Sequence, residues 1–169
     1  FAWPISREKG YFALDWEAAR NVPWGVLLLF GGGLALAGGF KGTGLAEWIG
    51  SGVSGFDVST WALVFIVTVA IVYLTEITSN TASTATFLPI LGAVAVGLGL
   101  DPRMLAIPVA LGASMAFMMP VATPPNAIVF SYEDMHLGDM VRAGFWLNIV
   151  AILVSFAAMY FLAPIVFGL

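Results

Sequence analysis

Long uncharged stretches alternate with short charged ones along the chain. Charged residues gather near the N-terminus, between Lys41 and Asp57, at Asp101 and Arg103, and between Glu133 and Arg142. The stretches between them are rich in aliphatic and aromatic residues and run over 22–40, 58–100, 104–132 and 143–169, with Glu76 as the one charge inside them. As helix, each is long enough to cross about 30 Å of hydrocarbon, and the second is about twice that length. The pattern therefore predicts an all-α integral membrane protein.

These stretches set the expected order of segments. In chain order we expect an amphipathic cytoplasmic lead-in over 1–21, a transmembrane helix over 22–40, an interfacial segment over 41–57, a re-entrant hairpin over 58–100, a broken transmembrane helix over 101–132, a loop over 133–142 and a transmembrane helix over 143–169. The chain opens at Phe1, in mid-pattern and without an initiator Met, which suggests a processed or incomplete chain.

Polar residues interrupt the second uncharged stretch in its middle. The apolar run from Thr60 to Leu74 gives way to residues 75–86, which include seven hydroxyl residues, an Asn and a Glu. Irregular backbone at membrane depth survives only where it is buried in protein or lines a watery cavity. The stretch therefore predicts a helical hairpin with its tip at Ser79 and Asn80, either of which is a good N-cap for the second arm. Two ordinary spans, whose Ser and Thr residues bond to neighbouring helices, explain the composition equally well.

Three prolines interrupt the third stretch. Pro120, Pro124 and Pro125 fall within a window of six residues. Each lacks an N–H and displaces the carbonyl four residues earlier, so together they release the carbonyls of Ala116, Pro120 and Val121. This predicts a helix broken into two halves that expose carbonyl oxygens and helix ends inside the membrane. A kink that neighbouring helices satisfy is the alternative.

Composition excludes several classes of function. Only 9% of the 169 residues are charged, against about 25% in an ordinary soluble domain, and 60% are hydrophobic. The net charge of −4 and the scattered basic residues exclude nucleic-acid binding. Without Cys there is no disulfide or thiolate site, and His136 is the single His. Since the uncharged stretches hold one carboxylate and no His, we expect no catalytic residues and no enzyme.

Lys and Arg near the ends of the spans indicate the orientation. If the N-terminal side is cytoplasmic, four basic residues lie inside and two outside, the inner set being Arg7, Lys9, Arg20 and Arg142. This bias is small. It predicts a plasma or inner membrane protein whose C-terminus lies outside the cytoplasm.

Paired broken helices are a functional signal, because helix ends carry partial charge. Helix N-termini attract anionic groups through free N–H groups, while C-termini and unwound carbonyls attract cations. A hairpin tip supplies both kinds of end. It therefore suits a site that holds a small cation beside a carboxylate without any charged side chain, and the scarcity of charge is compatible with anion transport.

Two motifs carry a resemblance to a known family. Ser79-Asn80-Thr81 is followed about forty residues later by Pro120-Val-Ala-Thr-Pro-Pro-Asn-Ala-Ile-Val129. On these motifs the chain resembles the C-terminal half of the divalent anion/sodium symporter (DASS) family, the Indy-type carriers of di- and tricarboxylates. The segment from Trp24 to Ala37 is also similar to that family, so the resemblance covers essentially the whole chain.

The resemblance implies a fold and a function. By it, the chain is one half of an inverted-repeat transporter that works by an elevator mechanism, and its partner is the missing N-terminal half. The complete carrier would be a homodimer in the lipid bilayer that couples Na⁺ to the transport of di- or tricarboxylates such as succinate. A sodium-independent anion exchanger of the same family is the alternative within transport. A noncatalytic scaffold subunit would explain the small size but not the two polar interruptions.

The resemblance also implies two sets of site residues. The sodium ligands would be Thr75, Ser79, Asn80 and the backbone carbonyl of Ala122. The substrate carboxylate would meet Ser79, Asn80, Thr81, Thr123 and Pro124. Glu76 lies on a different helical face from Thr75 and Ser79, which favours a structural charge facing a polar contact over direct ligation.

Overall fold

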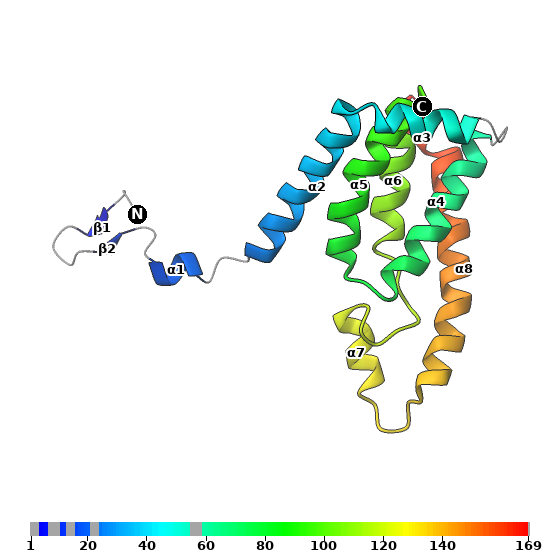
Figure 1. Ribbon diagram of the computed structural model, residues 1–169. Helices are drawn as coiled ribbons and strands as arrows, with labels where there is room; N and C mark the ends of the chain where they lie inside the picture. The colour runs from blue at the N-terminus through cyan, green and yellow to red at the C-terminus, as the bar shows by residue number, and fades with distance from the viewer. Residues whose placement is uncertain (1–3, 7–10, 13–15, 21–23, 55–58, 169) are drawn as a thin grey trace.

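The regular elements among the described residues are helices, apart from a short two-stranded ribbon near the N-terminus. The computed structural model describes residues 4–6, 11–12, 16–20, 24–54 and 59–168 (Figure 1). The elements are β1 Pro4–Ser6, β2 Tyr11–Phe12, α1 Trp16–Arg20, α2 Trp24–Gly42, α3 Leu45–Ser54, α4 Thr60–Thr75, α5 Asn80–Gly97, α6 Arg103–Gly112, α7 Pro124–Phe130, α8 Leu137–Phe161 and α9 Ala163–Phe167. The strands pair antiparallel. Phe1, Arg7 and Lys9, which the sequence analysis used, lie outside the described residues.

The helices α4, α5, α6 and α8 form a bundle, and α2 leans against α5 (Figure 1). Aliphatic residues of the four bundle helices share one buried cluster, which includes Val64, Ile71, Ala95, Leu105, Val109 and Met159. The approach of α2 is close because of one glycine. A Cβ at Gly33 would collide with the carbonyl of Ala85, so only glycine fits there.

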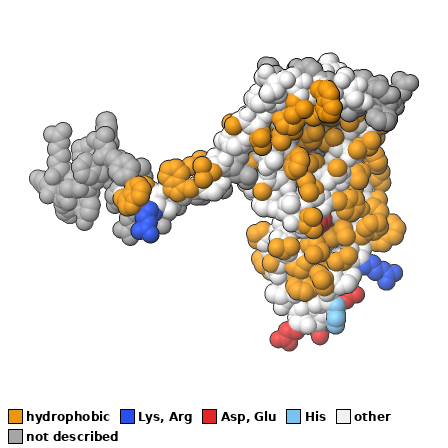
Figure 2. Space-filling view, in the orientation of Figure 1, with side chains coloured by type: hydrophobic (Ala, Val, Ile, Leu, Met, Phe, Trp, Pro, Cys, Tyr) orange, Lys and Arg blue, Asp and Glu red, His pale blue; other side chains and the backbone are white. Residues whose placement is uncertain are grey.

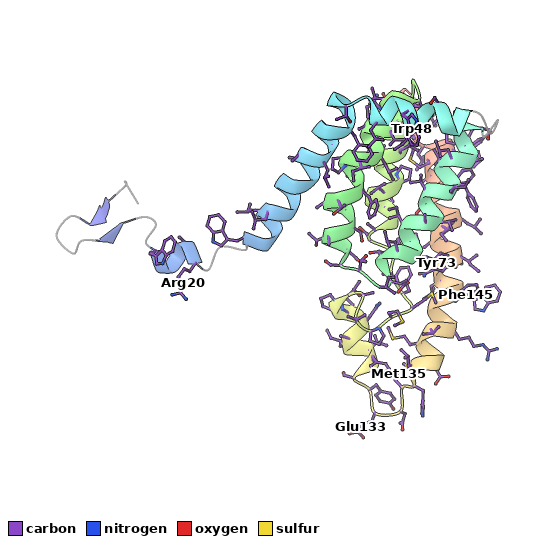
Figure 3. All side chains as sticks on the ribbon, in the orientation of Figure 1. Arg20, Trp48, Tyr73, Glu133, Met135 and Phe145 are labelled. Carbon is purple, nitrogen blue, oxygen red and sulfur yellow. The ribbon has the colours of Figure 1, made fainter. Side chains whose placement is uncertain are left out.

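Within the polar interruption at residues 75–86, residues 76–79 form the turn between two helices of a hairpin, and residues 80–86 form the first turns of α5. The arms are α4 and α5, and their far ends lie at the same end of the bundle (Figure 1). Ser59 caps α4 by accepting from the N–H of Ala62 at 3.2 Å, and Ser79 is the N-cap residue of α5. The turn lies beside the middle of α8, since the rings of Tyr73 and Phe145 are 6.5 Å apart (Figure 3).

The break between α6 and α7 begins earlier than the prolines predicted. Helix α6 ends at Gly112, and eleven residues, 113–123, separate it from α7. Pro124 and Pro125 occupy the first two positions of α7, where a missing N–H costs no hydrogen bond. These two prolines therefore begin a helix and do not interrupt one. The end of α6 depends on contacts outside it, because the N–H groups of Phe117, Met118 and Met119 bond to a side chain of the hairpin.

Two of the described helices, Asn80–Gly97 and Leu137–Phe161, are long and apolar enough to cross a membrane. Helix α8 begins six residues before the span expected from 143 onward, so its first turns carry Asp139 and Arg142. Its 25 residues extend about 37 Å, more than the roughly 30 Å of hydrocarbon. The extra length carries the helix into the charged end of the molecule.

Apolar side chains cover the sides of the bundle, and in Figure 2 the charged side chains of the bundle gather at the end where α7 joins α8. Glu133 and Met135 lie at the end where α7 joins α8, and Trp48 on α3 lies at the opposite end (Figure 3). Near the start of α6, the Arg103 side chain donates to Asp101 at 2.7 and 2.9 Å, and these bonds lower the pKa of Asp101 to about 2. This distribution suits a protein with an apolar belt between two polar faces.

Candidate functional site

A cavity of about 510 Å³ lies between the hairpin turn and the start of α7. Its walls come from three places: the start of α5, the segment after α6 and the start of α7. The lining residues are Ser79, Asn80, Thr81, Ser114, Ala116, Phe117, Ala122, Thr123, Pro124, Pro125 and Asn126. All five residues expected to meet the substrate are in this set. The volume falls within the range of about 300–1,000 Å³ that is typical of small-molecule sites.

The start of α5 offers hydrogen-bond donors to the cavity. Ser79 has extended backbone (φ −72°, ψ 132°), and its hydroxyl makes no capping bond within the described chain. The first backbone bond of the helix runs from the N–H of Ser83 to the carbonyl of Ser79 at 2.8 Å. The preceding amides of Asn80 and Thr81 therefore lack an intrahelical partner. Since the N-terminus of this 18-residue helix also carries partial positive charge, it suits a carboxylate.

The start of α7 is chemically different from that of α5. Pro124 and Pro125 have no N–H, and the next amide, that of Asn126, donates to the Thr123 hydroxyl oxygen at 3.3 Å. The Asn126 side chain donates to the carbonyls of Ala116 and Met119 at 2.9 and 3.0 Å. This wall is therefore held in shape by its own hydrogen bonds and offers the cavity few free donors. An anion in the cavity would find its amide donors on the hairpin side.

Oxygen atoms of three kinds converge behind the hairpin tip. The Thr75 hydroxyl, which is fully buried, lies 2.6 Å from Asn80 Oδ1 and 3.1 Å from the carbonyl oxygen of Ala113. Its single proton can serve only one of these acceptors. Hydroxyl, amide and carbonyl oxygens are the ligands that hard cations prefer. The donor set therefore fits a small hard cation, and it includes Ala113, which the sequence analysis did not single out.

Three of the four expected sodium ligands, Ser79, Asn80 and Ala122, line the main cavity. Thr75 does not line it but contacts Asn80, as described above. Ser79 and Ala122 also line a smaller cavity of about 360 Å³ with Thr78. Ser79 on the hairpin and Ala122 before α7 thus border the same two cavities.

Glu76 makes the polar contact that its helical face suggested. It is 4% exposed, and its carboxylate accepts from three backbone N–H groups and from the side chain of Asn148. It does not line the cavity. The geometry therefore agrees with a structural charge.

Ser114 and Phe117 were not among the expected site residues, Ala116 was expected only as a released carbonyl, and Asn126 had no expected role. The first three follow the end of α6, where the sequence has no proline. Asn126 belongs to the proline motif, where Thr123 before Pro124 was a local signal for a capped helix start. Among the described residues, no charged side chain lines the cavity.

Comparison with known proteins assigns the family. Residues 10–168 match the family described as "Sodium:sulfate symporter transmembrane region". The chain is 45% identical over 165 residues to the sodium-dependent dicarboxylate transporter SdcS of Staphylococcus saprophyticus, covering 97% of this chain and 32% of that protein. It is 43% identical over 163 residues to the SdcS of Staphylococcus aureus strain MRSA252, covering 96% of this chain and 31% of that protein. The chain thus spans about a third of the length of these relatives. Because the family match covers nearly all of it, the chain belongs to the sodium:sulfate symporter (DASS) family of integral membrane transporters.

Proposed function

We propose that the chain forms one half of a sodium-coupled carrier and binds a dicarboxylate in the cavity between the hairpin tip and α7. The observation that carries this proposal is the meeting of the Ser79–Thr81 tip with the start of α7 in one uncharged cavity. The relatives named sodium-dependent dicarboxylate transporters support the choice of ion and substrate class.

In this proposal one substrate carboxylate binds at the start of α5. Ser79, Asn80 and Thr81 donate from side chains and backbone, while the carboxylate lies against Thr123 and Pro124 on the opposite wall. The partial positive charge of the helix N-terminus replaces a basic side chain. A second carboxylate extends out of this half, so the substrate is a succinate-like dicarboxylate or a tricarboxylate.

The sodium ion binds behind the same tip. Its ligands are the Thr75 hydroxyl, the Ser79 hydroxyl, Asn80 Oδ1 and the Ala122 carbonyl. The 2.6 Å contact between Thr75 and Asn80 supports this set, because two of the four ligands already lie together. Sodium beside the carboxylate supplies the charge that the cavity wall lacks, which couples the two binding events.

The hairpin is re-entrant in this proposal. Glu76, at the hairpin turn, bonds to Asn148, which lies 11 residues after the first residue of α8 and 13 before the last. At about 1.5 Å per residue, the turn sits roughly 16 and 20 Å from the two ends of α8. If α8 crosses the membrane, the hairpin tip therefore lies near its middle. Both arms return to the outer face, which leaves the C-terminus outside the cytoplasm of a plasma or inner membrane.

The complete carrier contains a second, N-terminal half related by an inverted repeat. The chain spans about a third of its relatives, which supports a larger carrier. The exposed apolar side chains on α2 and α8 support contacts with lipid and with further protein surfaces. In this proposal the carrier is a homodimer and moves its substrate by an elevator mechanism.

The test is Asn80→Ala in the complete carrier, because this amide serves both the ion and the substrate. We expect sodium-driven uptake of radiolabelled succinate into proteoliposomes to be lost while membrane insertion is unchanged. Ser51→Ala, an exposed change on α3, is the control and should transport normally. Wild-type kinetics in Asn80→Ala would refute the site. Uptake by the unaltered carrier that persists without sodium would instead favour the exchanger.

A further inference from the structure

The Glu76 carboxylate lies where the hairpin, the segment after α6 and α8 meet. Its Oε1 accepts from the N–H of Phe117 at 2.8 Å and from that of Met118 at 3.0 Å, and its Oε2 accepts from the N–H groups of Met118 and Met119 at 3.0 Å each. Successive backbone N–H groups that converge on one anion form a nest. Here the anion in the nest is a side chain of the same protein.

The carboxylate and these amides depend on each other. Glu76 is buried, and neither of the two ion pairs found among the described residues involves it. A buried carboxylate destabilises the fold unless hydrogen bonds satisfy its oxygens. The amides lie outside any regular element, so they too need a partner. Removing the charge would therefore release the backbone of this segment.

The segment that Glu76 holds is a wall of the candidate substrate cavity. Ala116 and Phe117 line that cavity. The Ala116 carbonyl is bound from the other side by the Asn126 side chain. Glu76 also follows Thr75, which contacts Asn80 at the hairpin tip. The end of α4 thus fixes the position of the tip and of the opposite wall together.

Helix α8 completes this arrangement. Asn148 is fully buried and donates through Nδ2 to Glu76 Oε1 at 2.7 Å, and its Oδ1 has no partner among the described residues. The carboxylate only accepts, so Nδ2 must face it even though Oδ1 is left unpaired. One turn earlier, a Cβ at Gly144 would collide with the carbonyl of Phe117. The segment is therefore enclosed between Glu76 and α8.

We infer that Glu76 is a positioning residue for the substrate cavity: it binds neither ion nor substrate and fixes the wall at Ala116 and Phe117 through the amides of Phe117 to Met119. The transport part of this inference rests on the proposed function. The structural part, that Glu76 holds the backbone of residues 117–119, does not rest on the proposed function. Hydrogen exchange in the purified carrier measures it directly.

The test is Glu76→Gln in the complete carrier. The change keeps the shape but replaces one acceptor oxygen with an NH₂ group that faces N–H donors. We expect the amides of Phe117, Met118 and Met119 to exchange at least about tenfold faster, while those of the α4 and α8 core stay protected. We expect the KM for succinate to rise about tenfold, with the maximal rate per inserted carrier nearly unchanged.

Glu133→Gln is the matched control, because it makes the same change at an exposed site and should alter neither readout. If Glu76→Gln fails to insert, Asn148→Ala removes one donor to the carboxylate. It should raise the exchange rates of the same amides and the KM by a smaller factor.

Unchanged exchange at residues 117–119, or faster exchange with an unchanged KM, would overturn the inference. Faster exchange throughout the core would indicate a general structural role and would also overturn it. A wild-type carrier that does not transport succinate would refute the proposed function and leave the exchange result to decide the positioning role.

Discussion

The hydroxyl of Thr75 offers a sharp test of the oxygen cluster behind the hairpin tip. Thr75→Val keeps the branched shape and removes only the hydroxyl, which lies 2.6 Å from Asn80 Oδ1 and 3.1 Å from the Ala113 carbonyl. Thr68 provides the matched control, since it is also fully buried on α4 but donates to Val64, in its own helix, at 2.7 Å. Both changes replace a buried hydroxyl group with a methyl group, but the two hydroxyl groups bond to different acceptors.

The structure sets the size of each effect. After Thr75→Val, the buried Ala113 carbonyl loses its only described side-chain donor, whereas Asn80 lines the cavity, where solvent can replace the lost hydrogen bond. An unsatisfied buried acceptor costs about 1–3 kcal/mol. After Thr68→Val, the Val64 carbonyl still accepts the helical N–H of Thr68, so no buried acceptor is left unsatisfied and the cost is small. We therefore expect Thr75→Val to be less stable than Thr68→Val by about 1–3 kcal/mol.

Thermal unfolding in detergent measures the stability difference, and a sodium titration of succinate uptake measures the ion site. Thr75→Val should raise the sodium concentration for half-maximal uptake at least about tenfold, because it removes one proposed ligand. Thr68→Val should leave that concentration unchanged. Equal unfolding temperatures for the two variants would refute the hydrogen-bond assignment, and an unchanged sodium titration in Thr75→Val would remove this residue from the ion site.

Two further predictions concern packing and topology. Gly33→Ala should destabilise the protein by about 1–3 kcal/mol, because the added Cβ collides with the Ala85 carbonyl, whereas Gly32→Ala meets open space and should be neutral or stabilising; thermal unfolding of both variants is the measurement. Single cysteines at Thr60 and Gly99, in this chain without cysteine, should both react with an impermeant thiol reagent only from outside the cell, and labelling of Gly99 from the cytoplasm would refute the re-entrant hairpin.

The sequence predicted the helices whose limits depend on local chemistry. The polar break after Leu74 located the hairpin turn, and Ser79 is the N-cap residue of α5. The start of α8 was predicted six residues too late, because Asp139 and Arg142 were taken as the boundary of a loop. Charged residues end a membrane span but not a helix, and an acidic residue in the first turn even favours helix.

The limits of α6 and half of the cavity wall could not be predicted from the sequence. Gly112 ends the helix although the following residues, Ala113 to Met119, contain no proline or glycine. Their backbone is held by Glu76, which lies about forty residues earlier in the chain. Local sequence patterns carry no information about such a distant partner. The position of Ala116 and Phe117 in the cavity wall follows only from the packing of their segment against α4 and α8. The N-cap position of Ser79 could be predicted because it depends on local sequence, whereas the roles expected for the residues of the tip and of α7 came from the family resemblance and stay predictions.

The glycine contact between α2 and α5 has a mechanical consequence. Helices whose side chains interdigitate resist axial sliding, since each ridge must climb over the next. At Gly33 the contact is backbone against backbone, whereas Gly31, Gly32, Gly38 and Gly39 face open space. No side chains interdigitate at Gly33, and the close approach is confined to that one position. Since α3 follows α2 in the chain and packs against α5 at the end of the bundle, the contact at Gly33 also helps to set where α3 lies (Figure 1).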